Sequence, residues 1–530
     1  MIKGYVSLIL HAHLPFVRHP EVKEALEERW LFEAITECYL PLIQIFDKLL
    51  KEKVRFRITL SITPTLMAML EDKYLNEKYL EYILKTLKLS KLEIGRTFNL
   101  NEELRKTSLF YNKRYNELLQ IYKEYNQNLM NAFRKFDKLG CMDIITSAAT
   151  HGLLPLLMVN PQAARAQIAM GVKAYTEALG HAPNGIWLPE CAYSYGLDSI
   201  LKEFGIKYFI SEGIGVLNAC PKPIYGTYAP IETQEKVYVF PRDMESSHQV
   251  WSRTLGYPGD SNYREFYRDI GFELPIEYIA PYINPEGIRI DTGLKYYKIT
   301  DHTDNKEYYN RDKAMMVVKK HAKHFSNSRN AQISVASVRM EKTPIITCPY
   351  DAELFGHWWF EGPDFIYEFI KESAKENNYY ELITPLDYLN KYSINEISTP
   401  NPSSWGENGD FSVWLNPTNH WIYREIHDCE DKMFWMANTY KGLSELQERG
   451  LNQAVRELLL AQASDWAFIM KNNTAVNYAK RRVFTHVERF NKLYETIISE
   501  EIDEKWLEEI EKLDNIFPSI DYRIYKGMPK

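Results

Sequence analysis

The feature that most constrains the fold is a set of short apolar runs, each bounded by polar or turn-forming residues. They lie at residues 5–10, 56–62, 142–147, 186–188, 208–211, 237–240 and 345–347. Runs of this length without polar alternation are typical of strands buried on both faces of a parallel sheet. Long amphipathic stretches lie between the early runs, as at residues 26–50, where Leu26, Trp30, Ala34 and Cys38 recur every four positions. Strands that alternate with helices predict an α/β fold with a parallel sheet, open or closed into a barrel.

Later segments depart from this alternation. Residues 215–340 are rich in Tyr, Pro, Gly and Asp, and we interpret them as insertions and long loops at one edge of the sheet. The run NEISTPNPSSWGENGD, near 395–410, is linker-like. From about Trp421 to Leu513 the pattern is helical, with few Gly or Pro. We therefore predict a first domain at 1–400, with loops and a small inserted subdomain within about 191–340, and a helical domain at 401–530.

Charge and cysteine content exclude several classes of protein. The net charge is -7, and lysine and arginine are spread along the chain, so there is no electrostatic footprint for nucleic acid. The six cysteines form no CxxC pair, so neither a zinc ribbon nor a thioredoxin motif is supported. Their sparse, scattered pattern indicates a reducing compartment. The N-terminus MIKGYVSLILHAH is interrupted by histidines and predicts a strand, not a signal peptide. No stretch approaches the roughly 20 apolar residues of a membrane span. We expect a cytoplasmic protein that binds neither nucleic acid nor membrane.

Polar residues follow four of the apolar runs. His11 and His13 end the first run, His151 follows the third, and Glu190 follows the fourth. The last run is followed by Asp351, Glu353 and His357. Singly, each has an ordinary structural explanation, since such histidines are often satisfied polar groups and such carboxylates often cap helices. Because parallel strands share one carboxyl edge, where sites gather, we expect the four positions to form one site.

Two chemistries compete for this site. The pair of histidines in HAH is a metal-ligand spacing, and His151 could supply a third zinc ligand in a metal-dependent hydrolase. The rival is a metal-free pair of carboxylates, Glu190 and Asp351, one ionised and one protonated, as a retaining glycosidase requires. The aromatic residues of PYDAELFGHWWFEG and of SSWGENGDFSVW favour a sugar, because flat rings stack on pyranose faces.

Several motifs resemble the ordered regions of glycoside hydrolase family 57. They are HAHLPF, TSAATHGLLP, WLPECAY, PYDAELFGHWWFEG and SSWGENGDFSVWLN, in family order from residue 11 to about 425. The stretch AQASDWAFIM resembles the helical domain of the same family, so the resemblance covers nearly the whole chain. The chain is most similar to the subgroup of 1,4-α-glucan branching enzymes and the amylases related to them, and GYPGDSNYREFYRDIGFEL supports this subgroup.

The resemblance implies a distorted, incomplete (β/α)7 barrel with a small inserted domain and a C-terminal helical domain that contributes to the cleft. It implies a retaining mechanism without metal or cofactor, in which Glu190 is the nucleophile and Asp351 the acid/base. The remaining residues that it assigns to substrate binding are His11, His13, His151, Trp30, Trp251, Trp359, Trp405, Trp414, Asp465 and Trp466.

The resemblance leaves the acceptor open. The expected substrate is an α-glucan such as amylose, starch or glycogen, and we favour a branching enzyme that transfers to a 6-hydroxyl. Transfer to water would make an α-amylase, and transfer to a 4-hydroxyl a 4-α-glucanotransferase, with the same two carboxylates. A glucan-binding protein without activity is the non-enzymatic alternative. One departure favours hydrolysis: ECAYSYGLDSILKEFG passes almost directly from the nucleophile into a helix, with little chain to cover an intermediate.

Overall fold

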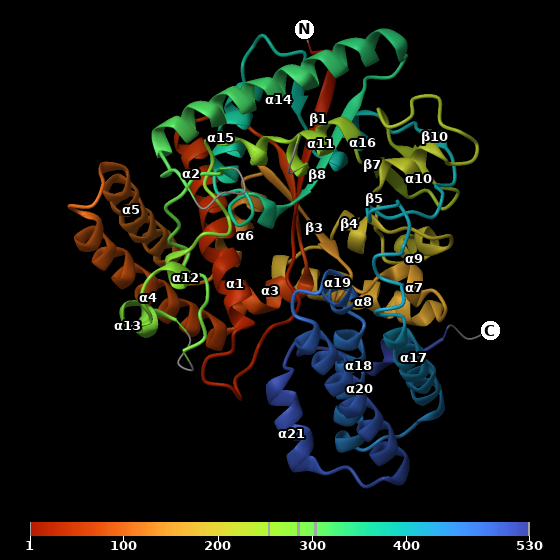
Figure 1. Ribbon diagram of the computed structural model, residues 1–530. Coiled ribbons are helices and arrows are strands. Elements are labelled where there is room, and N and C mark those ends of the chain that lie inside the picture. The colour runs from red at the N-terminus through yellow and green to blue at the C-terminus, as the bar shows by residue number, and fades with distance from the viewer. Residues whose placement is uncertain (1, 253–254, 284–286, 301–304, 528–530) are drawn as a thin grey trace.

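A curled sheet forms the centre of the structure, a computed structural model that describes residues 2–252, 255–283, 287–300 and 305–527 (Figure 1). Its strand order is β10-β6-β7-β5-β4-β3-β2-β1-β8, with β9 beside β1, and only the β6–β7 pair is antiparallel. The strands are β1 (Gly4–Ala12), β2 (Ile58–Ile62), β3 (Met142–Ser147), β4 (Gly185–Trp187), β5 (Tyr208–Ser211), β6 (Ile231–Glu232), β7 (Tyr238–Pro241), β8 (Ile345–Asp351), β9 (Tyr380–Leu382) and β10 (Glu396–Ile397). Each of the seven predicted runs forms a strand, while the two- and three-residue strands β6, β9 and β10 were not predicted.

The sheet curls into an incomplete barrel, as the resemblance implied. All nine residues of β1 are buried, which agrees with a strand covered on both faces. The two ends of the curl approach each other at one parallel bridge, between Arg242 after β7 and Thr347 of β8. Large apolar side chains fill the space inside the curl, among them Tyr5, Ile9, Ile145, Trp187, Tyr208, Ile210, Phe240 and Ile345.

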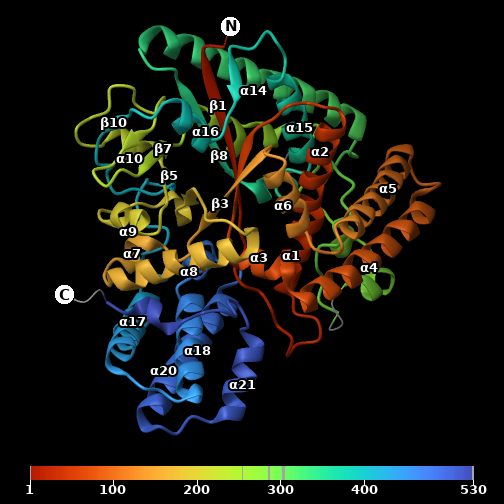
Figure 2. The ribbon, with the colours of Figure 1, turned by 180° about the vertical axis from the view of Figure 1, so that it is seen from behind.

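Helices cover the outer face of the sheet (Figures 1 and 2). They include α3 (Pro64–Glu71), α6 (Met130–Lys138), α7 (Leu154–Leu157), α8 (Pro161–Leu179), α9 (Leu197–Glu203), α10 (Gly213–Leu217), α11 (Met244–Trp251), α15 (Gly362–Ser373) and α16 (Pro385–Lys391). The long helices α4 (Lys73–Thr97) and α5 (Glu102–Glu124) pack on each other at one side of the molecule (Figure 1). The prediction of a single regular helix at 26–50 is wrong in one respect. The helix divides into α1 (Glu28–Ala34), a π-helical turn η1 (Ile35–Tyr39) and α2 (Leu40–Lys51).

The prediction of loops throughout 215–340 is also wrong in part. The short helices α12 (Ile270–Glu273) and α13 (Ile276–Ile279) lie among loops, but residues 311–339 form one long helix, α14 (Arg311–Arg339). Figure 1 shows α14 crossing the end of the sheet near the N-terminus. It packs against α15 through Phe325 and neighbouring buried side chains. Those parts of the prediction that fall on 253–254, 284–286 and 301–304 lie outside the described residues.

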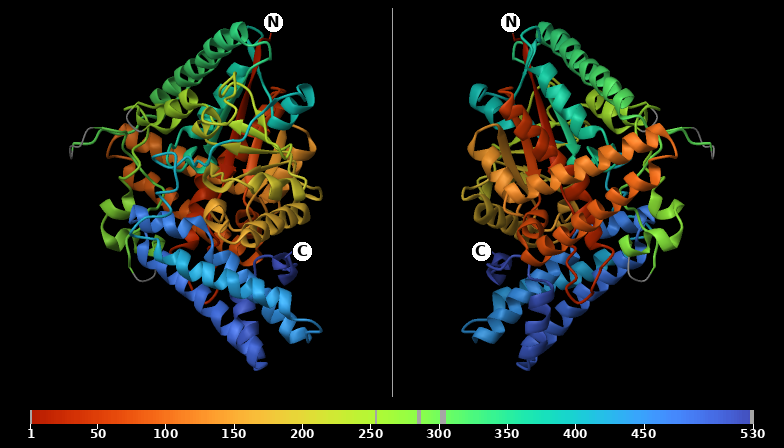
Figure 3. Two further views of the ribbon diagram at one scale, coloured as in Figure 1. Left: turned by 90° about the vertical axis from the view of Figure 1, so that its right-hand side faces the viewer. Right: turned by 90° about the vertical axis from the view of Figure 1, so that its left-hand side faces the viewer.

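The C-terminal segment is helical, as expected, and consists of α17 (Trp421–Thr439), α18 (Glu445–Ala461), α19 (Ser464–Asn472), α20 (Val476–Ser499) and α21 (Glu504–Leu513). In Figures 1 and 3 these blue helices lie beyond the end of the sheet toward which β1 runs. The helical segment therefore faces the carboxyl edge of the parallel strands. We propose that the first domain ends and the helical domain begins at about residue 400.

The segment near 395–410 is not a free linker. Its backbone forms bridges to the barrel, from Thr399 to Cys220 and from Ser403 to Tyr193, and Ser403 and Ser404 are buried. Trp405 therefore reaches the sheet edge on a fixed piece of chain. Within the described residues, no helix combines the length and apolar character needed to cross a membrane.

Candidate active site

The strand ends bring the predicted polar residues together at the edge that faces the helical segment. His11, on β1, is in register with Asp351 on β8 and with Ser61 on β2. The next neighbours along the sheet, β3 and β4, lead into His151 and Glu190. The prediction of one shared site at this edge is therefore matched by the geometry.

Three histidines line the floor of this site. His11 Nε2 lies 3.1 Å from His151 Nε2, and the rings of His13 and His151 stack with centroids 3.8 Å apart. The His11 ring lies flat on Trp187, at 4.4 Å and 5°. Burial, and then the charge on His13, lower the pKa values of His11 and His151 well below the usual range. These two histidines are therefore neutral hydrogen-bonding groups.

His13 has the opposite electrostatic character. Its Nε2 contacts both carboxylate oxygens of Asp465, at 3.0 and 3.1 Å, and its Nδ1 lies 3.1 Å from Thr63 Oγ1. Burial opposes a charge on the ring, but Asp465, Glu190 and Glu353 outweigh it and raise the pKa of His13. The surroundings thus favour a positive charge on His13 and the neutral form of His11 and His151.

Glu190 occupies a strained turn at the end of β4. It lies in the short helical turn η2 (Pro189–Cys191) with φ 62° and ψ 24°, a left-handed conformation that few residues other than glycine adopt. The indole N–H of Trp405 donates to Glu190 Oε2 at 2.7 Å, and the hydroxyl of Ser464 donates to Oε1 at 3.3 Å. Its side chain is 15% exposed, and burial raises its pKa to about 7. The turn therefore presents a carboxylate that can ionise and that a substrate can still reach.

Asp351 is the last residue of β8. Within the described part of the chain, no group donates a hydrogen bond to its carboxylate. Burial raises its pKa well above the usual range, the negative charges of Glu353 and Glu190 add to this, and Arg242 opposes it. The charge of Glu190 therefore influences the protonation of Asp351, and the two carboxylates are held in different protonation states. Glu190 receives hydrogen bonds in its ionised form, and Asp351 retains its proton. Such a pair can supply a nucleophile and an acid.

The helical segment completes the site from the other side. The α18–α19 junction carries Ser464 and Asp465, which contact Glu190 and His13 respectively. Ser464 also contacts His151 through side chain and backbone, and Gly152 forms a bridge with Ala463. The expected contribution of Asp465 to the cleft agrees with these contacts.

The predicted aromatic residues fall into two groups. Trp30, Trp251 and Trp405 are partly exposed, and Trp405 lies edge-on to both Trp187 and Trp251. Trp30 packs edge-on against Tyr478 of α20, so it lies where barrel and helical segment meet. The prediction that Trp359, Trp414 and Trp466 bind substrate is wrong, because they are at most 1% exposed and offer no ring face to a sugar. Their physical role is to pack the core.

Sequence reasoning missed several residues that touch the site. Trp187 and Ser464 lay inside motifs that we used, but neither has a spacing that predicts a role. Arg242 and Tyr39 also surround the carboxylates, as the causes of the shifted pKa of Asp351 and the contacts of Glu353 indicate. Glu353 was among the polar residues expected at the end of the last strand, but no role was predicted for it.

A metal ion is a poor fit to the histidines. His13, His151 and Asp465 offer ligand atoms within 4.8 Å of one another. However, His13 Nε2 and Asp465 Oδ1 are in direct hydrogen-bonding contact at 3.0 Å, closer than the separation of about 3.3 Å between two ligands of tetrahedral zinc. His11 further occupies His151 Nε2. The expectation of metal-free chemistry stays a prediction that treatment with a chelator tests.

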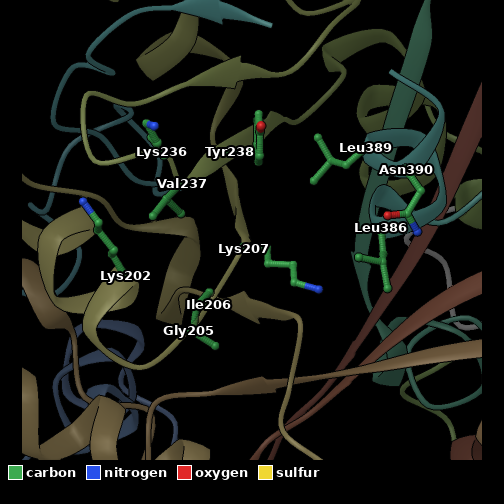
Figure 4. Close-up of a pocket in the computed structure, with 10 residues that line it drawn as sticks. All are labelled: Lys202, Gly205, Ile206, Lys207, Lys236, Val237, Tyr238, Leu386, Leu389 and Asn390. Atoms are coloured by element: carbon green, nitrogen blue, oxygen red, sulfur yellow. The ribbon is translucent and has the colours of Figure 1, made fainter. Parts of the chain in front are cut away.

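A cavity of about 360 Å³ lies at the opposite end of the sheet, beside the residues that precede β5 and β7. It is lined by Lys202, Lys207, Lys236, Tyr238 and side chains of α16 (Figure 4). In Figure 4 the amino groups of the three lysines point in different directions. Lys202 also pairs with Glu235, and Lys207 with Asn184. This cavity lacks the converging groups of the carboxylate site.

Comparison with known proteins agrees with this geometry. The model of glycosyl hydrolase family 57 matches residues 7–344, which include His11, His13, His151 and Glu190 and end directly before β8, the strand that carries Asp351. This chain belongs to glycosyl hydrolase family 57. A second model, for the C-terminal domain of 1,4-alpha-glucan branching enzymes, matches residues 425–525 of this family member, and so covers most of the helical segment.

Relatives of this family 57 enzyme carry two names. A 1,4-alpha-glucan branching enzyme from Thermococcus kodakarensis is 35% identical, over 97% of this chain and 78% of that one. The structure of an alpha-amylase from Thermotoga maritima is 42% identical, with a TM-score of 0.94 and full coverage of both chains. A branching enzyme from Pyrococcus horikoshii is 33% identical, with a TM-score of 0.89 over 100% of this chain and 98% of that one.

Proposed function

We propose that this family 57 protein is a retaining 1,4-α-glucan branching enzyme, with Glu190 as nucleophile and Asp351 as acid/base. The observation that carries the proposal is the difference between the two carboxylates: Glu190 accepts hydrogen bonds from Trp405 and Ser464, and Asp351 accepts none in the described chain. The match of residues 425–525 to the C-terminal domain of branching enzymes supports the choice of reaction.

In the first step, Glu190 attacks the anomeric carbon of an α-1,4-linked glucose as Asp351 protonates the departing glycosidic oxygen. The C–O bond breaks, a glycosyl ester forms on Glu190, and the shortened glucan leaves with a new hydroxyl. Neutral His11 and His151 and cationic His13 can hydrogen-bond the hydroxyls of the sugar at this position.

The second step depends on the loss of charge at Glu190. Once it is an ester, Glu190 no longer raises the pKa of Asp351, so the ionised Asp351 becomes accessible as a base. Asp351 then takes the proton of an acceptor hydroxyl, and that oxygen displaces Glu190 from the anomeric carbon. A glucan 6-hydroxyl as acceptor creates an α-1,6 branch.

Hydrolysis is the second candidate function, because the chain beside the nucleophile is short. Only residues 192–196 separate the turn η2 from α9, so little polypeptide covers the intermediate. Poor cover admits water as acceptor. The 42% identity to a protein named alpha-amylase favours the same alternative.

Incubation with amylose distinguishes the candidates. We expect the product, after treatment with a debranching enzyme, to release a distribution of short chains, which requires new α-1,6 linkages. Reducing ends that accumulate without debranchable chains would instead assign an amylase. The variant Glu190→Gln should lose activity by on the order of 10⁴-fold or more while still binding amylose. Near-normal turnover by this variant would contradict the assignment of Glu190.

A further inference from the structure

Asp351 has a second acidic neighbour that the proposed mechanism does not use. Glu353 lies two residues further along, in the short turn η5 (Ala352–Leu354). Its Oε1 accepts the backbone N–H of His13 at 3.1 Å and the hydroxyl of Tyr39. Asp351, at the end of β8, pairs with His11 of the neighbouring strand β1. The two carboxylates therefore follow one another along the end of β1.

The π-helical turn η1 holds the chain that carries both carboxylates. Three successive residues of this turn contact it: Glu37 Oε2 lies 2.6 Å from His357 Nδ1, Cys38 Sγ donates to the carbonyl of Ala352 at 2.9 Å, and Tyr39 donates to Glu353. A π turn widens the helix by one residue, so that consecutive side chains can reach a neighbouring segment that a regular α-helix would not present to them. Interruptions of this kind are frequent at functional sites.

We propose that Glu353 is a positioning residue that keeps Asp351 protonated before glycosyl transfer, with Tyr39 and the His13 backbone holding the Glu353 carboxylate. The inference rests on the proposed roles of Glu190 and Asp351. Burial raises the pKa of Glu353 as well, but the hydrogen bonds from Tyr39 and the His13 backbone and the charge of His13 oppose this. Asp351 accepts no hydrogen bond in the described chain, so we assign the negative charge of the neighbouring pair to Glu353.

Among the charged groups around Asp351, Glu353 is the one that can favour its protonated form throughout the reaction. The titratable and charged groups that face the two carboxylates are Glu190 after β4, Arg242 after β7, His13 after β1, and Cys38 and Tyr39 of η1. Of these, Arg242 favours the ionised form of Asp351, and only Glu190 opposes it. Because Glu190 loses its charge in the glycosyl ester, Glu353 is the constant influence that restores the acid form at the end of each turnover.

The pH dependence of kcat/KM for amylose cleavage tests the proposal. Asp351 must be protonated for the first step, so its deprotonation sets the alkaline limb. We expect Glu353→Gln to move this limb to lower pH by about one unit, because a like charge near Asp351 is removed. Glu353→Asp keeps a carboxylate and should leave the limb within about 0.3 unit of the parent. An alkaline limb of Glu353→Gln that coincides with the parent limb overturns the proposal.

A matched control separates charge from support of the turn. Cys38→Ala removes a hydrogen bond to the same turn without changing charge, so its alkaline limb should match that of the parent. A shift in Cys38→Ala as large as that in Glu353→Gln would assign both effects to geometry and overturn the proposal. If Glu353→Gln does not fold, Tyr39→Phe is the substitute: its limb should move in the same direction by less, and an unmoved limb counts against Glu353.

The controls also separate this inference from the proposed function. A parent enzyme without activity, or an active Glu190→Gln variant, would reject the catalytic assignment itself. An active parent, an inactive Glu190→Gln and an unmoved limb in Glu353→Gln would reject only the role of Glu353.

Discussion

Single residues decide which carboxylate attacks and which protonates. Glu190 is held by the indole of Trp405 at 2.7 Å and the hydroxyl of Ser464 at 3.3 Å, and its pKa is about 7. Burial and two negative neighbours raise the pKa of Asp351 well above its usual range. The two groups titrate as one coupled pair, which predicts a bell-shaped pH profile. Glu190 sets its acid limb, since activity is lost as pH falls and Glu190 is protonated.

The variant Trp405→Phe tests this assignment. It keeps an aromatic ring but removes the N–H that stabilises the ionised form of Glu190, so the pKa of Glu190 should rise. The acid limb of kcat/KM should therefore move to higher pH by about one unit. Ser464→Ala removes a longer contact and should move the limb by less. An acid limb that stays in place in Trp405→Phe would contradict the assignment of Glu190 to that limb.

The sequence predicted the polar residues of the site better than its aromatic ones. His11, His151 and Glu190 directly follow apolar runs, and the shared edge of a parallel sheet brings such positions together whatever the loops do. The exposure of a tryptophan depends on packing between distant segments. Trp359 contacts Tyr263 and Phe365, and these contacts bury a ring that sequence similarity alone assigned to the groove.

At the scale of elements, the close approach of η1 to η5 and the residues after it holds the acid Asp351 in place. Gly356 has φ 123°, and a Cβ atom at this position would lie 1.9 Å from the backbone oxygen of Glu37. Neither backbone can give way without moving the turn that carries Glu353. This glycine therefore permits the contact between the two turns.

Gly356→Ala should destabilise the protein by about 3 kcal/mol or more and reduce activity, because overpacking against backbone adds to the strain of a positive φ. Gly140→Ala is the matched control: Gly140 has φ 70° but nothing within 4 Å of its Cβ position. It should cost about 1 kcal/mol and leave kcat/KM unchanged. Denaturant unfolding and amylose kinetics measure both. Equal losses of stability and of activity in the two variants would show that the close contact between Gly356 and Glu37 contributes to neither.

Elements that depend on tertiary contacts were harder to predict than the strands. The helix α14 contains many Ser, Asn and Lys residues, so its sequence lacks a clear apolar face, and its packing against α15 stabilises it. The π turn at 35–39 inserts one residue into an otherwise regular helical pattern, which periodicity cannot reveal.

At the scale of the whole molecule, the site lies between the barrel and the helical segment. Asp465 supports the charge of His13, and Ser464 contacts Glu190 and His151, so neither part contains the complete site. A substitution at the junction can therefore lower the activity of the protein without lowering the thermal stability of the barrel or of the helical segment.

Asp465→Asn should lower kcat/KM by on the order of ten- to a hundredfold, because an amide keeps the contact with His13 but not its charge. Its melting temperature should stay close to that of Asp428→Asn, a control that removes an exposed charge paired with Lys432 on α17. Activity of Asp465→Asn equal to that of the control would mean that the helical segment contributes shape alone to the site.

Trapping of the glycosyl-enzyme tests the central claim most directly. A maltosyl fluoride that carries a second fluorine next to the reacting carbon forms the ester faster than the ester reacts on, and peptide mass spectrometry locates it. The account predicts a maltosyl adduct on Glu190, within residues 186–196, and no adduct in Glu190→Gln. An adduct on another residue, or turnover of the reagent with inverted stereochemistry and no adduct, would contradict it.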